Sequence, residues 1–235
     1  MKALPRAAAL LTLLALGGCA LPRSAGQPQT PGAGPMASQS PAQLLAAVQG
    51  DADRIDQATD SAARAQLLAA ATASARQCLA QAPNDAACPY AQAQVLGLRA
   101  REHPVEAPSL LKQMLANLTR AEALDPALDH AGPARLSAVV LLRAPPWPLG
   151  PGDVDAATAA AQRAVQRDPG YPPNLITLGQ AQSKADGAPQ ARATFNQAQQ
   201  AVQGWVGAPK QAAAEVAAER AQWQRTVEQA LKELQ

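Results

Sequence analysis

Two cysteines, at positions 78 and 88, have a spacing that predicts a covalent bond. Cys78 falls at the end of one predicted helix and Cys88 near the start of the next, so a helical hairpin would bring the two thiols together. We expect a disulfide, which closes a loop of about ten residues and stabilises the fold by 2.5 to 3 kcal/mol in the chain-entropy model. The alternatives are two free thiols or a metal site. Structural zinc takes four ligands and only His103 and His130 remain, so we expect no metal and place both histidines in solvent or at helix caps.

A third cysteine, Cys19, ends an N-terminal segment that is typical of secretion. The segment starts with Lys2 and Arg6, continues as an apolar run over residues 7–16 and contains no acidic residue. It is too short to span a membrane stably and has the layout of a signal peptide. The four residues that end at Cys19 read Leu-Gly-Gly-Cys and resemble a bacterial lipobox, in which the cysteine is lipidated after cleavage. The alternative is an ordinary signal peptide with an incidental cysteine.

The lipobox predicts a lipoprotein on the periplasmic side of a bacterial membrane. Residues 1–18 would be removed, and acyl chains on Cys19 would supply stable anchoring. Ala20 follows the cysteine in place of the aspartate that resembles an inner-membrane retention signal, which favours the outer membrane. Residues 19–40 are rich in proline, glycine, serine and glutamine, so we expect a disordered tether that spans about 25 Å root-mean-square.

Catalytic motifs are missing from the sequence. It contains no Gly-x-Ser-x-Gly element, no phosphate-binding Gly-x4-Gly-Lys loop and no His-Glu-x-x-His. Asp129 and His130 lie near Ser137, but a serine in an apolar helix beside a lone histidine is most often structural. Without Lys2 and Arg6, the 20 basic residues become 18 and balance the 18 acidic residues. We therefore expect no enzyme activity, no cofactor and no binding of nucleic acid.

Alanine- and leucine-rich segments separated by prolines fill the chain from residue 41 to 235. No convincing alternating strand pattern occurs, so we expect one all-α domain. Its six aromatic residues are too few to build the core, which must come from alanine, leucine and valine. The predicted helices cover residues 41–56, 60–82, 86–101, 107–124, 131–143, 153–168, 172–185, 188–203 and 209–234.

A repeat of 43 residues organises these helices. Three helices end alike, at Pro83, Pro126 and Pro169, and five residues before each proline comes a small residue, namely Cys78, Ala121 and Ala164. A second set of positions continues this register through the last pair: Ala157, Ala161, Leu175, Leu178, Gly179, Ala191, Phe195 and Ala198. This spacing resembles the tetratricopeptide repeat and predicts an α-solenoid of helical hairpins with a C-terminal capping helix. The alternative is that alanine-rich helices match any loose helical template. The usual period of this repeat is about 34 residues. The additional residues fall at 101–107 and 144–152, and both insertions should lie on the same edge of the stack.

The second insertion lies in the most unusual stretch of the chain, Gly132 to Asp153. An apolar helix there runs into a segment with four prolines and one tryptophan, Trp147. Proline fixes φ and restricts the residue before it, so this connector should be stiff. Asp153 is a natural N-cap for the next helix.

Residues 78–198 resemble the T component family of periplasmic TRAP-type ligand transport, whose members are lipidated, tetratricopeptide-like helical proteins. The resemblance depends on the cysteine pair, Asp129-His130-Ala131-Gly132-Pro133 with Arg135, Arg143-Ala144-Pro145, Trp147-Pro148, Gly150-Pro151-Gly152-Asp153 and Tyr171-Pro172-Pro173-Asn174. It implies a scaffold with an apolar channel or cavity that associates with a periplasmic substrate-binding subunit, or acts without a transporter, and that forms either a monomer or a homo-oligomer.

The resemblance singles out Arg135, Arg143, Trp147 and Asp153 as candidate binding residues. In a structural role, Arg143 and Asp153 would pair across the loop and Trp147 would pack onto the helices. In a functional role, Trp147 would be an exposed anchor, since tryptophan and arginine dominate binding hot spots. Two functions follow. The first is a scaffold that binds a periplasmic protein or a small apolar ligand, and the second is an outer-membrane assembly factor for a secretin, a pilus or another envelope complex.

Overall fold

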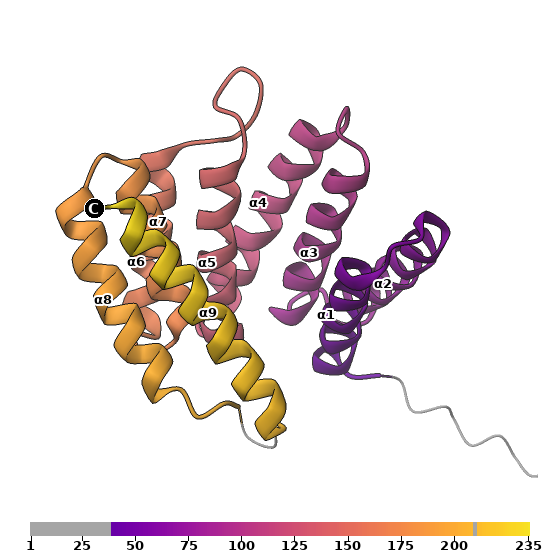
Figure 1. Ribbon diagram of the computed structural model, residues 1–235. Helices are drawn as coiled ribbons and strands as arrows, with labels where there is room; N and C mark the ends of the chain where they lie inside the picture. Colours follow the sequence, from indigo (N-terminus) through magenta and orange to yellow (C-terminus); the bar gives the residue numbers. More distant parts are fainter. Residues whose placement is uncertain (1–38, 209–210) are drawn as a thin grey trace, which may run out of the picture. The chain divides into compact units, whose positions relative to one another are not determined.

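The alanine- and leucine-rich segments form helices, as their high helix propensity requires. The computed structural model describes residues 39–208 and 211–235, and within these ranges the chain forms nine helices and no strand (Figure 1). The all-α prediction is confirmed, with helix ends displaced by four residues at most. The predicted signal peptide, Cys19 and most of the tether lie outside the described residues. The helices are α1 Pro41–Gln57, α2 Ser61–Gln81, α3 Ala87–Glu102, α4 Ala107–Leu124, α5 Leu128–Arg143, α6 Val154–Arg167, α7 Pro172–Lys184, α8 Ala188–Gly204 and α9 Ala213–Glu233.

Consecutive helices pack as hairpins. The most extensive contacts join α1 to α2, α3 to α4, α5 to α6 and α7 to α8, while α9 covers α7 and α8 as a capping helix (Figure 1). Successive hairpins contact each other through α1 and α3, through α4 and α5, and through α5 and α7. The result is a solenoid-like stack, as the repeat predicted. Helices α3 and α5 diverge, so α4 makes the main connection between the second and third hairpins.

The 43-residue period corresponds to a repeated helix end. Cys78, Ala121 and Ala164 are each completely buried. Their carbonyl oxygens accept the N–H groups of the three residues that precede the prolines, over 2.9, 2.9 and 3.0 Å. Small side chains at these positions allow the two helices of a hairpin to approach closely, which confirms the register.

The last hairpin shows the same principle with an aromatic residue. Phe195 of α8 is 1% exposed and packs against Gly179 of α7. A Cβ atom at position 179 would lie 2.8 Å from the phenylalanine ring, so only glycine leaves room for it. This contact joins two positions of the predicted register and lies within one hairpin.

The two insertions emerge on one edge of the stack, as expected (Figure 1). The longer connection, between α5 and α6, folds back on itself. The Gly152 N–H donates to the Pro145 carbonyl over 2.8 Å, and the Asp153 N–H donates to the Leu141 carbonyl over 3.0 Å. The Asp153 carboxylate accepts the Ala156 N–H over 2.9 Å, so the predicted N-cap of α6 is confirmed.

Cys78 and Cys88 form the predicted disulfide across the α2–α3 connection. Both residues are completely buried and pack with Leu44 of α1 and with Leu79. The bond therefore fastens the first two hairpins at a point where their cores meet. The alternatives of free thiols and of a metal site at these cysteines are wrong.

Replacing both cysteines in a Cys78→Ala/Cys88→Ala variant should lower the free energy of unfolding by about 2.5 to 3 kcal/mol, because the unfolded chain regains the freedom of a loop of ten residues. Guanidinium titration followed by circular dichroism measures the difference. Wild type under reducing conditions is the control and should move toward the variant. Equal stability of the oxidised, reduced and substituted chains would contradict this role.

Candidate functional site

The helix α5 opens with a left-handed turn. Asp129, His130 and Ala131 have φ angles of 51°, 55° and 60°, and the regular right-handed helix begins only at Gly132. Aspartate and histidine tolerate this region better than most residues, but alanine does not. Three consecutive left-handed residues cost energy that the surrounding structure must offset.

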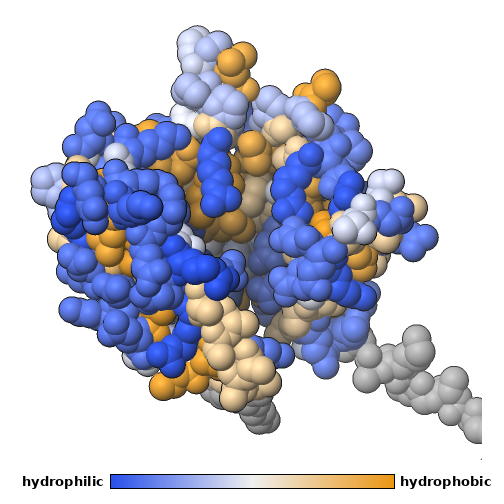
Figure 2. All heavy atoms as spheres, viewed as in Figure 1, coloured by the Kyte–Doolittle hydropathy of each residue, from blue (hydrophilic) through white to orange (hydrophobic). Residues whose placement is uncertain are grey.

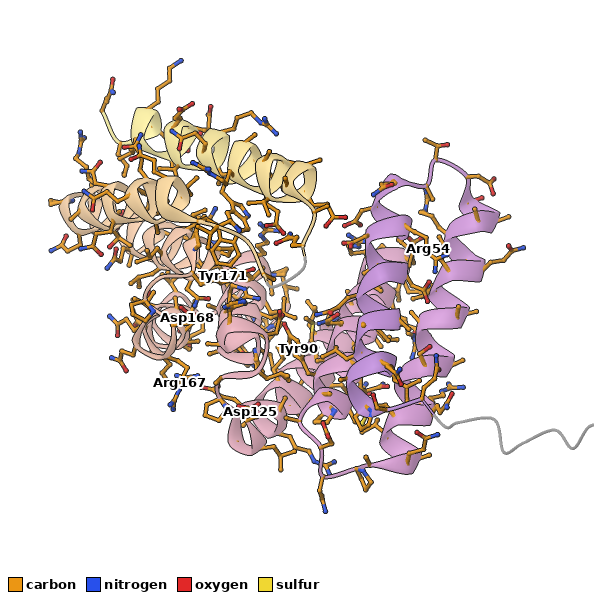
Figure 3. The ribbon with its side chains drawn as sticks, turned by 90° about the horizontal axis from the view of Figure 1, so that it is seen from below. Arg54, Tyr90, Asp125, Arg167, Asp168 and Tyr171 are labelled. Atoms are coloured by element: carbon orange, nitrogen blue, oxygen red, sulfur yellow. A yellow bond between two sulfur atoms is a disulfide. The ribbon has the colours of Figure 1, made fainter. Side chains whose placement is uncertain are left out.

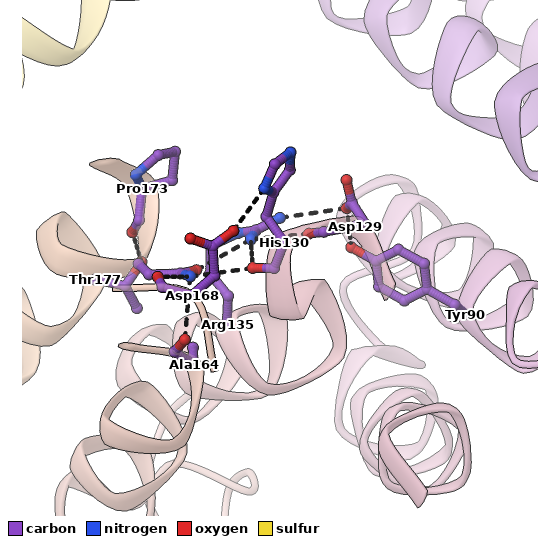
Figure 4. A network of polar contacts seen from close by, with 9 residues as sticks. Tyr90, Asp129, His130, Arg135, Ala164, Asp168, Pro173 and Thr177 are labelled. Atoms are coloured by element: carbon purple, nitrogen blue, oxygen red, sulfur yellow. Dashed lines mark hydrogen bonds and ion pairs between the residues drawn. The ribbon is translucent and has the colours of Figure 1, made fainter. Parts of the chain in front are cut away.

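The side chain of Arg135 stabilises this turn. Its Nη1 donates to the carbonyl oxygens of Asp129 and His130 over 3.2 and 2.9 Å, and Nη2 lies 3.3 Å from the Asp129 carboxylate (Figure 4). The fully buried Asn174 of α7 donates to the same His130 carbonyl over 3.1 Å and accepts from Arg135 Nη1 over 3.1 Å. The carbonyl groups of the turn thus accept charge-assisted hydrogen bonds from Arg135.

The turn also joins the helices on its two sides. Tyr90 of α3 donates its hydroxyl proton to Asp129 Oδ2 over 2.6 Å, and His130 Nδ1 lies 2.7 Å from Asp168 Oδ2 at the end of α6. Burial, and then the negative charge of Asp129, raise the pKa of Tyr90 above its ordinary value, so the hydroxyl keeps its proton. Figure 3, seen from below, shows Tyr90 on one side of this junction, with Asp168 and Tyr171 on the other.

Four rings gather beside the turn. His130 stacks on Tyr171 with ring centroids 4.2 Å apart, and Trp205 and Trp223 meet Tyr171 edge to face at 5.4 and 5.9 Å. The Arg135 guanidinium lies 5.0 Å from the Tyr171 ring centroid, within cation–π range. The side chain of His130 is partly open to solvent, as expected, and it also links the turn to the C-cap residue of α6, to α7 and, through Tyr171, to the capping helix. His103 ends α3 as expected.

An apolar groove lies where α3 and α5 diverge. Its volume is about 590 Å³. Figure 2 shows a hollow between these helices with hydrophobic atoms in its depth. Helices α3 and α5 form the walls, α4 forms the floor, and part of α1 lines the rim. The apolar lining residues are Leu98, Leu111, Met114, Leu136, Val139 and Val140. Tyr90 also lines the groove, and Arg143, Ala144 and Pro145 line the part next to the α5–α6 loop.

The four sequence-predicted residues lie in different surroundings. Arg135 is partly buried in the turn network, whereas Arg143 is exposed and lines the groove. Asp153 is used as a helix cap, and no ion pair joins it to Arg143 in the described part of the chain. The expected pairing across the loop is therefore wrong. Trp147 is 86% exposed, so the expected packing of this side chain onto the helices is wrong as well.

The sequence reasoning missed Tyr90, Asn174 and Asp168 as partners of the turn. A signal existed for the turn itself, because Asp-His before Gly-Pro interrupts a helical pattern with residues that tolerate positive φ. No comparable signal marks Tyr90, which lies 39 residues before its partner.

No protein-family model matches this chain, and no curated protein is significantly similar to it. Among residues 39–208 and 211–235, no helix is long and apolar enough to cross a membrane. The same residues bring no three histidine, cysteine or acidic side chains together as a metal site. The groove, the turn and the exposed loop are therefore the features from which a function can be argued.

Gly132 allows Tyr90 to reach the turn, and a Gly132→Ala substitution tests this contact. Its Cβ would lie 2.3 Å from the Tyr90 hydroxyl and 2.7 Å from the Asp129 carboxylate. The clash should lower the free energy of unfolding by about 1 to 3 kcal/mol, measured by thermal and guanidinium unfolding.

The matched control is Gly50→Ala in α1, where a Cβ meets no atom within 4 Å. This substitution should stabilise the chain by up to about 1 kcal/mol, because alanine has the higher helix propensity. Equal effects at the two glycines would show that the Tyr90 contact has no bearing on stability.

Proposed function

We propose that this chain is a membrane-anchored scaffold of tetratricopeptide-like helical hairpins that binds an apolar ligand, or an apolar segment of a partner protein, in the α3–α5 groove. The groove itself is the observation that supports this most. Its volume of about 590 Å³ falls in the range of small-molecule pockets, which are mostly apolar with a few polar groups at fixed places.

The groove is preformed by contacts among the helices that line it. The Tyr90–Asp129 hydrogen bond joins α3 to the start of α5, and α4 packs against both helices. Between these connections the walls stay apart and leave Leu136 and Val139 only partly covered. A groove held open in this way needs little reorganisation to accept a ligand, which lowers the cost of binding.

The polar groups lie at the rim of the groove. Arg143 is exposed beside the α5–α6 loop, and Asp53 and Arg101 lie on the α1 and α3 side. Arg101 is paired with Asp56 over 2.8 Å. An apolar ligand that carries an anionic group would place its apolar part between the helices and its charge near Arg143.

The apolar lining supports ligand binding, whereas the open side of the groove is the shape that the assembly-factor alternative would have, so the lining alone separates the two functions. The open side of the groove also leaves room for a segment of a partner. A periplasmic substrate-binding subunit of a TRAP-type system is the partner that the sequence resemblance predicts. That association, the lipid anchor, the outer-membrane address and the homo-oligomer remain predictions.

Filling the groove tests the binding site. Val139→Phe places a larger side chain on the α5 wall and should weaken binding of a fluorescent long-chain acyl probe by at least about tenfold, which corresponds to 1.4 kcal/mol. Fluorescence titration of the purified full chain measures the affinity.

The matched control is Val206→Phe, at a position that is 87% exposed and outside the groove. It should leave the affinity unchanged. If both variants bound the probe as tightly as wild type, the groove would not be its site.

Replacing Cys19 tests the anchor. Cys19→Ala removes the thiol that would carry the acyl chains, so the product should be uncleaved or soluble where wild type is cleaved and fractionates with the outer membrane. Membrane fractionation and intact-mass measurement give the result. Normal cleavage and membrane fractionation of the variant would contradict the lipoprotein prediction.

A further inference from the structure

We propose that the α5–α6 loop is a lipid-docking device, whose tip residues Trp147 and Leu149 insert into the interfacial region of a bilayer. This surface is separate from the groove and from the turn network.

The exposed large apolar side chains concentrate at one edge of the domain. Trp147 is 86% exposed and Leu149 is 71% exposed, both on the α5–α6 loop. Val105, on the α3–α4 connection, is 97% exposed. Figure 1 places both connections on the same edge, and Figure 2 shows hydrophobic atoms at both tips. Within the described residues, three of the five exposed large hydrophobic side chains therefore lie on this edge.

The α5–α6 loop has no charged side chain and few N–H groups without an acceptor that would resist transfer out of water. Residues 144–152 carry no charged side chain. Four of the nine are prolines, which have no N–H group. The N–H groups of Leu149 and Gly150 donate to the Pro146 carbonyl over 3.0 and 3.2 Å. Those of Ala144 and Gly152 donate to Val140 and Pro145.

Among the described residues, the Trp147 N–H has no acceptor within hydrogen-bond distance, although the parallel bridge between Pro146 and Gly152 places it opposite the Gly152 carbonyl. An unsatisfied backbone group in hydrocarbon costs several kcal/mol, and among the described residues only the carbonyls of Pro145 and Pro146 in this loop accept a backbone hydrogen bond. The loop backbone therefore suits the hydrated interfacial region, where water and headgroups can donate to the other carbonyls, and only the side chains of Trp147 and Leu149 would reach deeper.

The loop is also rigid before it meets a partner. A Cβ at Gly150 would lie 2.6 Å from the Pro145 carbonyl oxygen, and one at Gly152 would lie 2.2 Å from the Ala144 carbonyl oxygen. These close approaches fold the two halves of the loop against each other. Insertion would therefore cost little additional ordering of the backbone.

A lipid surface fits this tip better than a protein surface does. A stable protein interface buries about 1,000 Å² or more, whereas the tip presents two large apolar side chains on a narrow projection. The loop has no charge to match that of a protein partner. Tryptophan is enriched at membrane interfaces because its ring is apolar and its N–H is polar.

With the proposed lipid anchor, two inserted side chains would be enough for the tip to dock on the bilayer. Two inserted side chains give weak binding alone, but a chain already held by acyl groups at Cys19 meets the bilayer at high effective concentration. Helix α1 begins at the edge opposite the loop (Figure 1). Residues 20–38 can extend to roughly 65 Å, which exceeds the roughly 24 Å length of the 16-residue helix α5. The tether would therefore be long enough for the loop edge to reach the bilayer.

Docking at this edge would also determine how a ligand reaches the groove. Arg143, Ala144 and Pro145 line the groove and form the base of the loop. With Trp147 in the interface, this end of the groove would face the lipid headgroups and Arg143 would lie near their phosphates. An acyl chain would then enter from the bilayer. This last step rests on the proposed function of the groove, whereas docking of the tip rests only on the proposed lipid anchor.

The test uses an environment-sensitive nitrobenzoxadiazole label on the full chain in vesicles of phosphatidylethanolamine and phosphatidylglycerol. Leu149→Cys places the label at the tip and keeps Trp147. Gly170→Cys is the matched position, on the exposed α6–α7 turn at the opposite edge (Figure 1). Cys78 and Cys88 are bonded to each other, so they do not compete for the label, and mass measurement establishes that Cys19 is unlabelled.

The tip label should shift to shorter wavelength, be quenched by nitroxides on the acyl chains and be protected from iodide, while the label at position 170 should behave as in water. Adding Trp147→Ala to the tip-labelled chain should reduce the ratio of inserted to free tip by about tenfold or more. A tip label as accessible to iodide as the one at position 170 would overturn the proposal. Protection of the tip only after a periplasmic protein fraction is added would overturn it in favour of a protein partner.

A separate measurement distinguishes the two proposals. Probe binding to the detergent-solubilised chain reports on the groove without a bilayer. Insertion of the tip without probe binding would leave docking intact and contradict the ligand-binding function, and probe binding without insertion would do the reverse.

Discussion

The hydrogen bonds of the Arg135 guanidinium stabilise the turn that joins α5 to α3 and α7. Helix α5 starts with a left-handed turn, and the Arg135 guanidinium donates hydrogen bonds to two carbonyl groups of this turn. Without such a donor, three residues with positive φ would have backbone oxygens with too few partners and strained dihedral angles. Asn174 donates to one of the same carbonyls and also to those of Ala164 and Asp168. The third hairpin and the fourth are thus joined through one buried polar network.

The geometry of that turn extends to the groove. Asp129 faces α3 and accepts from Tyr90, whereas His130 faces α6 and α7. A regular helical turn could not direct two adjacent side chains to these opposite neighbours while leaving Gly132 close to the Tyr90 hydroxyl. Helix α5 is held to α3 near its start by the Tyr90–Asp129 hydrogen bond, and farther along residues of both helices line the groove between them. The groove is therefore a consequence of how the turn sets the direction of α5.

Sequence reasoning predicted the features that depend on local pattern. Helices follow from propensity and proline positions, and the hairpin register follows from small residues at Cys78, Ala121 and Ala164, which must be buried for the pairs to pack. The disulfide follows because its two ends flank a single turn.

Contacts between residues far apart in the sequence, and the choice of partner for a charged side chain, could not be predicted in this way. Arg143 and Asp153 have opposite charge and suitable spacing, but the helix cap already uses the carboxylate. The ring cluster unites His130 with Trp205 and Trp223, 75 or more residues away, and no periodicity connects them.

The aromatic side chain of the α5–α6 loop differs in its exposure from the other aromatic side chains of the domain. Tyr90 and Phe195 are buried, and Tyr171, Trp205 and Trp223 pack against one another around the turn. Trp147 is the remaining aromatic residue of the chain, and it is exposed on a closed, proline-rich loop. A connection between two antiparallel helices needs only a few residues and no large apolar side chain. Within the described domain, the exposed ring contributes no packing that would offset its contact with water. The proposed docking at a lipid surface would give this ring the apolar contact that the domain does not, and a rigid, uncharged loop is suited to such a surface.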